Sequence, residues 1–207
     1  YPQEQRFLRV RLPFDGTLAS NIRRWQLFSF EGEKIANDVR KESLSFNRLI
    51  AIGSKISDSK KRALHKRILS SYKTHNEMNA DRDGVGILIP KRGSLRFTVK
   101  EQRATEKNYR QNTSSAGIYY PDKEIYVHCK AEQFKTESKK LLLAWDAIEA
   151  IRKGNNPFSV YQSYKNPYML VGNHYKNKTS FMVIGILSAP DGFIEYAFSQ
   201  QLALAVS

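Results

Sequence analysis

Histidines within a basic stretch are the residues of this sequence with the clearest potential for chemistry. His65 and His75 both lie in the segment 59–77, SKKRALHKRILSSYKTHNE, which is rich in lysine and arginine. A histidine titrates near neutral pH and can take or give a proton in general acid–base catalysis. Cations around it would stabilise the charge on a phosphate. Such groups are sufficient for RNA cleavage without a metal ion, because the 2′-hydroxyl needs a base and the leaving oxygen needs a proton donor.

A phenol can supply the second group of such a reaction, since it donates to or orients a phosphate oxygen. Tyr196 stands in the C-terminal segment that we expect to close the sheet. We therefore interpret His75, Tyr196 and His65 as candidate catalytic residues. His75 is preferred as the base because it is expected at the end of a helix, facing the next strand. The same histidines are also typical of solvated or helix-capping positions, and both interpretations stay open here.

Metal-dependent chemistry has little support in the sequence. It contains no phosphate loop, no dinucleotide fingerprint and no HExxH motif. The string YPDKEIYVHCK at 120–130 has an acid and a lysine spaced as in metal-dependent nucleases, but His128 stands where the second acid should be. The four histidines lack paired acids. We therefore expect no metal site and no cofactor.

Positive charge is the strongest bulk property of the chain. Its 207 residues carry 34 lysines and arginines against 20 acids, which gives a net charge of +14. Such a field favours phosphate backbones or anionic membrane surfaces. The cations are spread among segments with folded patterns, and eleven tyrosines and eleven phenylalanines lie between them, a mixture suited to stacking bases beside phosphate contacts. The candidate nucleic-acid-binding residues are Lys60, Lys61, Arg62, Lys66, Arg67, Lys91, Arg92, Arg96 and Arg103.

The cellular compartment is indicated only indirectly. The single cysteine, Cys129, excludes an internal disulfide and a multi-cysteine zinc site. No apolar run approaches the length of about 18 residues that a membrane span needs, and no signal pattern is visible at the N-terminus. We expect a cytoplasmic protein with no membrane partner.

Hydrophobic periodicity predicts the elements that must position these residues. Leu64, Ile68 and Tyr72 form one stripe of a basic helix over 60–75, and the apolar run 85–89 predicts a central strand after it. Alternation at 95–99 predicts a strand in a hairpin with 85–89. A broad apolar stripe predicts the longest helix over 132–153. Further strands are expected at 5–12, 25–30, 47–52, 168–171, 180–187 and 193–198, and a weak helix at 33–42.

This order of elements predicts an α+β fold of ferredoxin-like (RRM-type) architecture, with an antiparallel sheet and helices packed on one side. We expect a single nucleic-acid-binding unit over 1–207. It is divisible into sub-domains 1–100 and 117–207, joined by the polar loop 101–116.

Several short strings occur in an informative order. They are DRDGV at 81–85 with Pro90 and Gly93, LRF at 95–97, NPY at 166–168, SFMVI at 180–184 and GFIEYAFS at 192–199. Their order and spacing resemble the CRISPR repeat-processing endoribonucleases, in the branch that stays bound to its processed hairpin. The resemblance implies a catalytic histidine on the helix before strand 85–89. Residues 172–175, GNHY, depart from it, because the family has a serine-rich string there.

The function expected from the sequence is RNA binding, extended by the resemblance to metal-independent processing of structured, CRISPR-repeat-like RNA. A non-catalytic nucleic-acid-binding or assembly subunit is an alternative, in which the positive charge only packages the nucleic acid. A toxin-type nuclease is a second alternative. RNA is the expected partner, together with other subunits of a ribonucleoprotein complex. The charge alone would bind DNA as well.

If the chain cleaves RNA, the reaction should persist in excess EDTA. His75→Ala should then lower the cleavage rate by about 10²-fold or more while sparing binding, as expected for a lost acid–base group. The measurement is single-turnover cleavage of a structured RNA. Unchanged cleavage by His75→Ala, or its loss in EDTA, would contradict this mechanism, and an inactive parent protein would favour the non-catalytic alternative.

Overall fold

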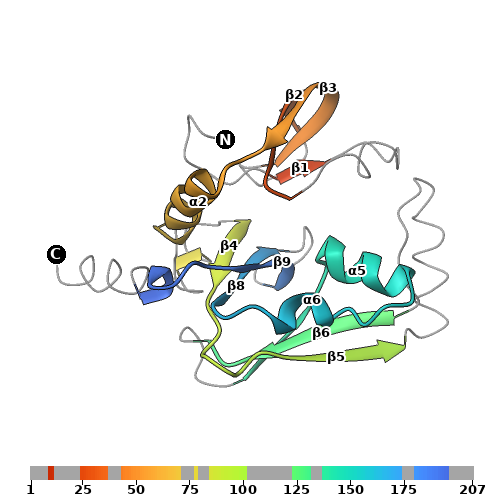
Figure 1. Cartoon of the computed structure of the whole chain (residues 1–207). Helices are drawn as coiled ribbons and strands as arrows, with labels where there is room; N and C mark the ends of the chain where they lie inside the picture. The colour runs from red at the N-terminus through yellow and green to blue at the C-terminus, as the bar shows by residue number, and fades with distance from the viewer. Residues whose placement is uncertain are drawn as a thin grey trace.

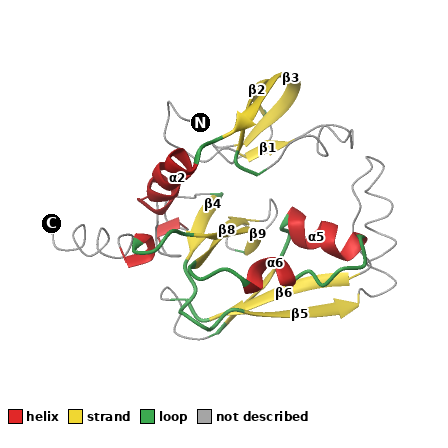
Figure 2. Ribbon diagram, in the orientation of Figure 1, coloured by secondary structure: helices red, strands yellow, loops and turns green. Residues whose placement is uncertain are grey.

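The computed structural model describes residues 9–11, 24–36, 43–70, 77–78, 84–101, 123–131, 137–173 and 180–195 (Figure 1). Within these ranges the chain is a mixed α+β protein (Figure 2). The helices are α2 (Asp58–Ser70), α5 (Trp145–Arg152) and α6 (Ser159–Gln162). The strands are β1 (Arg9–Arg11), β2 (Gln26–Lys34), β3 (Ser43–Lys55), β4 (Val85–Leu88), β5 (Arg96–Glu101), β6 (Lys123–Cys129), β7 (Ser138–Leu141), β8 (Pro167–Asn173) and β9 (Phe181–Ser188).

A sheet buried on both faces forms the centre of the structure. Its strand order is β4-β8-β9, and all its pairs are antiparallel. Successive residues of a strand point to opposite faces, so Tyr168 and Met169 of β8 enter different apolar clusters, each with 0% of its surface exposed. Burial on both sides explains why the sequence of β4 is apolar without alternation.

Helix α2 covers one face of this central sheet (Figure 1). Leu69 of the helix packs with Ile87, Tyr168 and Leu187 of the three strands. Ile68 packs against the same cluster. These contacts with the sheet, rather than intrinsic propensity, hold the helix in place.

The second sheet, β5-β6-β7, lies under the other face, together with α5 and α6 (Figure 1). Its inner side contributes Ile125 and Val127 to the larger core, and Leu142, just after β7, joins them. The two sheets are joined directly, because the backbone N–H of Leu143 donates to the carbonyl of Val183 at 2.7 Å. Phe97 extends the same core by stacking on Phe158, with ring centroids 4.7 Å apart.

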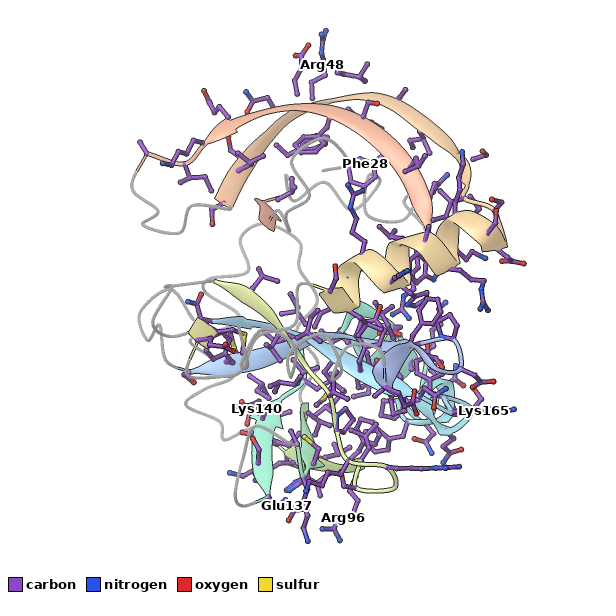
Figure 3. All side chains as sticks on the ribbon, turned by 90° about the vertical axis from the view of Figure 1, so that its left-hand side faces the viewer. Phe28, Arg48, Arg96, Glu137, Lys140 and Lys165 are labelled. Carbon is purple, nitrogen blue, oxygen red and sulfur yellow. The ribbon has the colours of Figure 1, made fainter. Side chains whose placement is uncertain are left out.

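The third sheet, β1-β3-β2, is a long β2–β3 hairpin with β1 added in parallel to β3. The hairpin curves into an arch, with Phe28 on its concave side and Arg48 on its convex side (Figure 3). Its described contacts with the rest of the protein centre on Arg24 and Trp25. The Arg24 guanidinium donates to the Asp146 carboxylate at 2.7 Å and to the carbonyl of Ile186 at 3.2 Å.

Trp25 holds the base of this hairpin in an uncommon backbone conformation. Its φ is 64°, a region that non-glycine residues seldom adopt and that persists only where the surroundings hold it. Its carbonyl accepts from the N–H of Ile56 at 2.9 Å, and its ring lies 4.8 Å from that of His65. The hairpin is thus fixed against α2 at the point where β3 leads into the helix.

Several expectations from the sequence are confirmed. The α+β class holds, α2 overlaps the predicted basic helix over residues 60–70, and strands occur at 26–34, 43–55, 85–88, 96–101, 167–173 and 181–188. The single ferredoxin-like sheet is not confirmed, because the described strands form three sheets of three strands each. Nor is β4 the central strand of its sheet, since β8 takes that position.

The predicted hairpin of 85–89 with 95–99 is wrong. β4 pairs with β8 and β5 pairs with β6. After β4 the chain forms a bridge between Pro90 and Ala131, which directs it toward β6 instead of back along β4. Strands that precede residues 102–116 and strands that follow them therefore occur together in the β4-β8-β9 sheet and in the β5-β6-β7 sheet.

The long helix predicted over 132–153 is also wrong. Residues 138–141 form β7, and the helix begins only at Trp145. Leu141 and Leu142 fit a helical stripe, but in the structure Leu142 is buried by bridging Val183 of the central sheet. Residues 193–195 of the predicted strand 193–198 form a helical turn, since the chain reverses at Gly192, whose φ is 80°.

Among the described helices, none has the length and apolarity that crossing a membrane requires.

Gly86 should be intolerant of a side chain. A Cβ built on Gly86 would lie 1.8 Å from Sδ of Met78, which is 1% exposed. We expect Gly86→Ala to lower the free energy of unfolding by about 1–3 kcal/mol, as overpacking does. Urea unfolding measures this. Gly185→Ala in β9 is the matched control, because its Cβ would meet only Leu170 at 3.8 Å. Equal losses of stability in the two variants would contradict the packing argument.

Candidate nucleic-acid interface

Helix α2 is positioned by its ends and by its inner face. Ser57 accepts a hydrogen bond from the N–H of Lys61 with its carbonyl at 2.9 Å, and Asp58 lies in the first turn, where the helix dipole favours an acid. His65 and Leu69, one turn apart, are the buried residues of the helix. With this side against the central sheet, the opposite side faces solvent.

The solvent-facing side of α2 is cationic. Lys60, Arg62 and Lys66 are exposed, and Lys61 and Arg67 are partly buried; these five residues are called the α2 surface. Asp58 is the only acid of the helix, and the Lys61 ammonium donates to it at 2.7 Å. That hydrogen bond and the lysine charge lower the pKa of Asp58.

Arg62 has a further contact within the protein. Its guanidinium carbon lies 5.3 Å from the centre of the Phe193 ring, in the helical turn after β9. A cation over an aromatic face is attracted by the ring quadrupole, most often with a guanidinium. This contact favours one position of the Arg62 side chain on the surface.

His65 lies inside the structure. It is 6% exposed, and its Nδ1 shares a hydrogen bond of 2.9 Å with the hydroxyl of Tyr168. Burial lowers the pKa of His65 and raises that of Tyr168. The ring thus connects α2 to β8 as a neutral group and is covered by Trp25. This position suits packing, whereas a general base must reach a substrate.

Three predicted site residues lie outside the described residues. They are His75, Tyr196 and Arg103. The catalytic roles of His75 and Tyr196 and the binding role of Arg103 remain predictions.

A second set of cations gathers at one end of the β5-β6-β7 sheet. Lys91 and Arg92 belong to the turn before β5, and the backbone N–H of Lys91 donates to the carbonyl of Lys130 at 2.6 Å. Arg96 pairs in register with His128, and His128 pairs with Lys139. We call Lys91, Arg92, Arg96, His128, Lys130 and Lys139 the sheet-end surface.

Glu137 is the acid at this sheet-end surface. It forms an ion pair with Arg96. The hydrogen bond from Arg96 lowers the pKa of Glu137, and the charges of Arg96, His128 and Lys130 add to the effect. Its negative charge is therefore compensated by the cations around it.

Sequence reasoning found Lys91, Arg92 and Arg96 but missed Lys130 and Lys139. Their proximity depends on the register of β6 with β7. No pattern within either segment shows that register. The sequence predicts a helix at residue 139, and only a strand predicted at 138–141 would have indicated this contact.

The two surfaces lie on opposite sides of the central sheet. In Figure 3, α2 lies above the strands of that sheet, and Arg96 and Glu137 project from the bottom of the structure. The predicted binding residues that the structure describes therefore form two separate groups.

Other chemistry has little support among the described residues. No group of three or more histidines, cysteines or acids that could hold a metal ion occurs in the described ranges. The Cys129 thiol is buried, and burial raises its pKa to about 11, which keeps it protonated and unreactive.

Comparisons with protein families, with curated proteins and with solved structures found no match.

His65 should make stability depend on pH. Its pKa is lowered in the folded state, so below about pH 6.5 the unfolded chain binds a proton that the folded chain resists. We expect the free energy of unfolding to fall as the pH drops from 7.5 toward the folded pKa. His65→Gln should remove this part of the pH dependence. Urea unfolding of parent and variant across that range measures it, and parallel pH profiles would contradict the assignment.

Proposed function

We propose that this chain is an RNA-binding subunit and that the α2 surface is its main contact with phosphates. The observation that carries the proposal is the division of α2 into two sides. Its inner side is fixed to the central sheet through His65 and Leu69, while its outer side presents Lys60, Arg62 and Lys66.

Electrostatics favours a polyanionic partner for this helix. Arg62 and Lys66 stand one turn apart, and like charges at this spacing destabilise a helix by about 0.2–0.5 kcal/mol. Phosphates placed between them would reverse the sign of that interaction. Each neutralised phosphate also releases condensed counterions, which is the main source of affinity without sequence specificity.

RNA is the preferred partner because of the strings at 81–97 and 166–199 that resemble RNA-processing proteins. The binding proposal does not depend on the ferredoxin-like arrangement that the resemblance would imply. It also requires no cleavage. His65 is buried, and its described hydrogen bond attaches α2 to β8. The binding proposal therefore corresponds to the non-catalytic alternative, and cleavage is decided by the His75→Ala experiment.

Removing two exposed charges should weaken binding without unfolding the protein. If the parent contacts roughly 4–6 phosphates, the slope of log K against log salt should be about −3 to −5. Lys60→Gln with Lys66→Gln should reduce the size of that slope by about 1.5, because two contacts are lost. The free energy of unfolding should change by less than about 0.5 kcal/mol. Fluorescence anisotropy with a labelled RNA hairpin at several salt concentrations measures both slopes.

Lys153→Gln with Lys165→Gln is the matched control, because it removes the same charge from exposed positions outside both surfaces. We expect its slope to stay close to that of the parent. Equal losses in the two double variants would show that net charge, and not the α2 surface, is responsible. A DNA hairpin of the same sequence tests the preference for RNA.

A further inference from the structure

The outer side of the β5-β6-β7 sheet combines aromatic and charged groups. Residues paired across antiparallel strands lie on the same face, so Arg96, His128 and Lys139 form one row, and Thr98 and Tyr126 begin the next. The alternate residues of β6, Ile125, Val127 and Cys129, are buried in the core. The row of Arg96 therefore faces solvent, and Figure 3 shows Arg96 projecting from the bottom of the structure.

Tyr126 stands in the middle strand of this side and is held at two points. Its hydroxyl donates to the Glu124 carboxylate at 2.7 Å, and the Lys139 ammonium lies 4.2 Å from the centre of its ring. Tyr126 is also paired with Thr98 on one side and Leu141 on the other, which fixes its backbone, so it loses little further conformational freedom on binding and its ring face is suited to stacking. The ammonium over that face is a mobile charge on a flexible stem.

Charge on this side favours an anionic occupant. Lys91, Arg92, Lys130 and Lys139 are exposed around one end of the sheet. The acids nearby are Glu137 and Glu124, and both accept hydrogen bonds from the protein, from Arg96 and Tyr126 respectively. His128 is held by Thr98, whose Oγ1 lies 2.9 Å from its Nε2.

We infer that the outer side of the β5-β6-β7 sheet binds a single-stranded segment of RNA, with one base stacked on Tyr126. This inference rests on the proposed RNA binding and adds a second contact to it, separate from the α2 surface. The base displaces the Lys139 ammonium from the ring, and the ammonium then pairs with a phosphate of the same segment. Lys130, Lys91 and Arg92 lie beside it to take the adjoining phosphates.

The aromatic ring decides between a single strand and a duplex. In a duplex the faces of the bases are already stacked on one another, so Tyr126 would gain nothing from it. An unpaired base offers a free face, and stacking of this kind tolerates any base because each has a π-face. The α2 surface exposes lysines and arginines, so it can bind the phosphates of paired and of unpaired RNA equally well.

The experiment compares Tyr126→Ala with Tyr126→Phe, which keeps the ring and is the matched control. Fluorescence anisotropy measures the affinity of each full-length variant for a labelled 12-nucleotide oligouridine and for a blunt RNA duplex, with thermal unfolding as the test of folding. Stacking on one aromatic is worth about 1–3 kcal/mol, so Tyr126→Ala should weaken oligouridine binding by about 5- to 100-fold. Tyr126→Phe should stay within about twofold, and duplex binding should not change in either variant.

Lys139→Met is a second variant that keeps the side-chain stem. It should reduce the salt slope for oligouridine by about 0.7, the value for one phosphate on a single strand. Oligouridine binding by Tyr126→Ala within twofold of the parent, or an equal loss on the duplex, overturns the inference. If Lys60→Gln with Lys66→Gln still weakens RNA binding in that case, the proposed function stands without the second contact. If the parent protein binds neither the oligouridine nor the duplex, both this inference and the proposed function are overturned.

Discussion

Burial of the β4-β8-β9 sheet on both faces is the constraint on which the rest of the structure depends. Each strand of this sheet must supply apolar residues to two clusters, and each cluster must then be closed by another layer. α2 closes one side, while the β5-β6-β7 sheet with α5 and α6 closes the other (Figure 1). On the α2 side this burial includes the hydroxyl of Tyr168, and His65 satisfies it with a hydrogen bond. An unpaired buried hydroxyl would cost about 1–3 kcal/mol.

This arrangement leaves the charges of the chain on the outside of both covering layers. The inner side of α2 is committed to the sheet, so its lysines and arginines face solvent. The inner side of β5-β6-β7 is committed to the core, so Arg96 and Lys139 face solvent on the opposite side of the protein. Two separate cationic surfaces are a direct consequence of one doubly covered sheet. The proposed RNA contacts follow that division.

The N-terminal hairpin is attached to this body by an ion pair and a strained residue. Arg24 reaches Asp146 at the start of α5, and Asp146 also accepts from the hydroxyl of Tyr161 at 2.8 Å. Trp25 covers His65 in its left-handed conformation. The same histidine therefore contacts the hairpin, α2 and β8. Its ring is buried where these three elements meet.

The sequence by itself determined the α+β class, the basic helix, most of the strands and the excess of positive charge. These properties are local, because alternation, helical periodicity and composition can be read within one segment. Only the tertiary structure decided that β4 pairs with β8, that 138–141 is a strand and that His65 is buried. Pairing partners lie far apart in the chain, and the choice between them depends on which faces bury together. The sheet-end surface likewise exists only through the pairing of Arg96 with His128 and of His128 with Lys139. No pattern within a single segment contains that register, because it is set by contacts between segments.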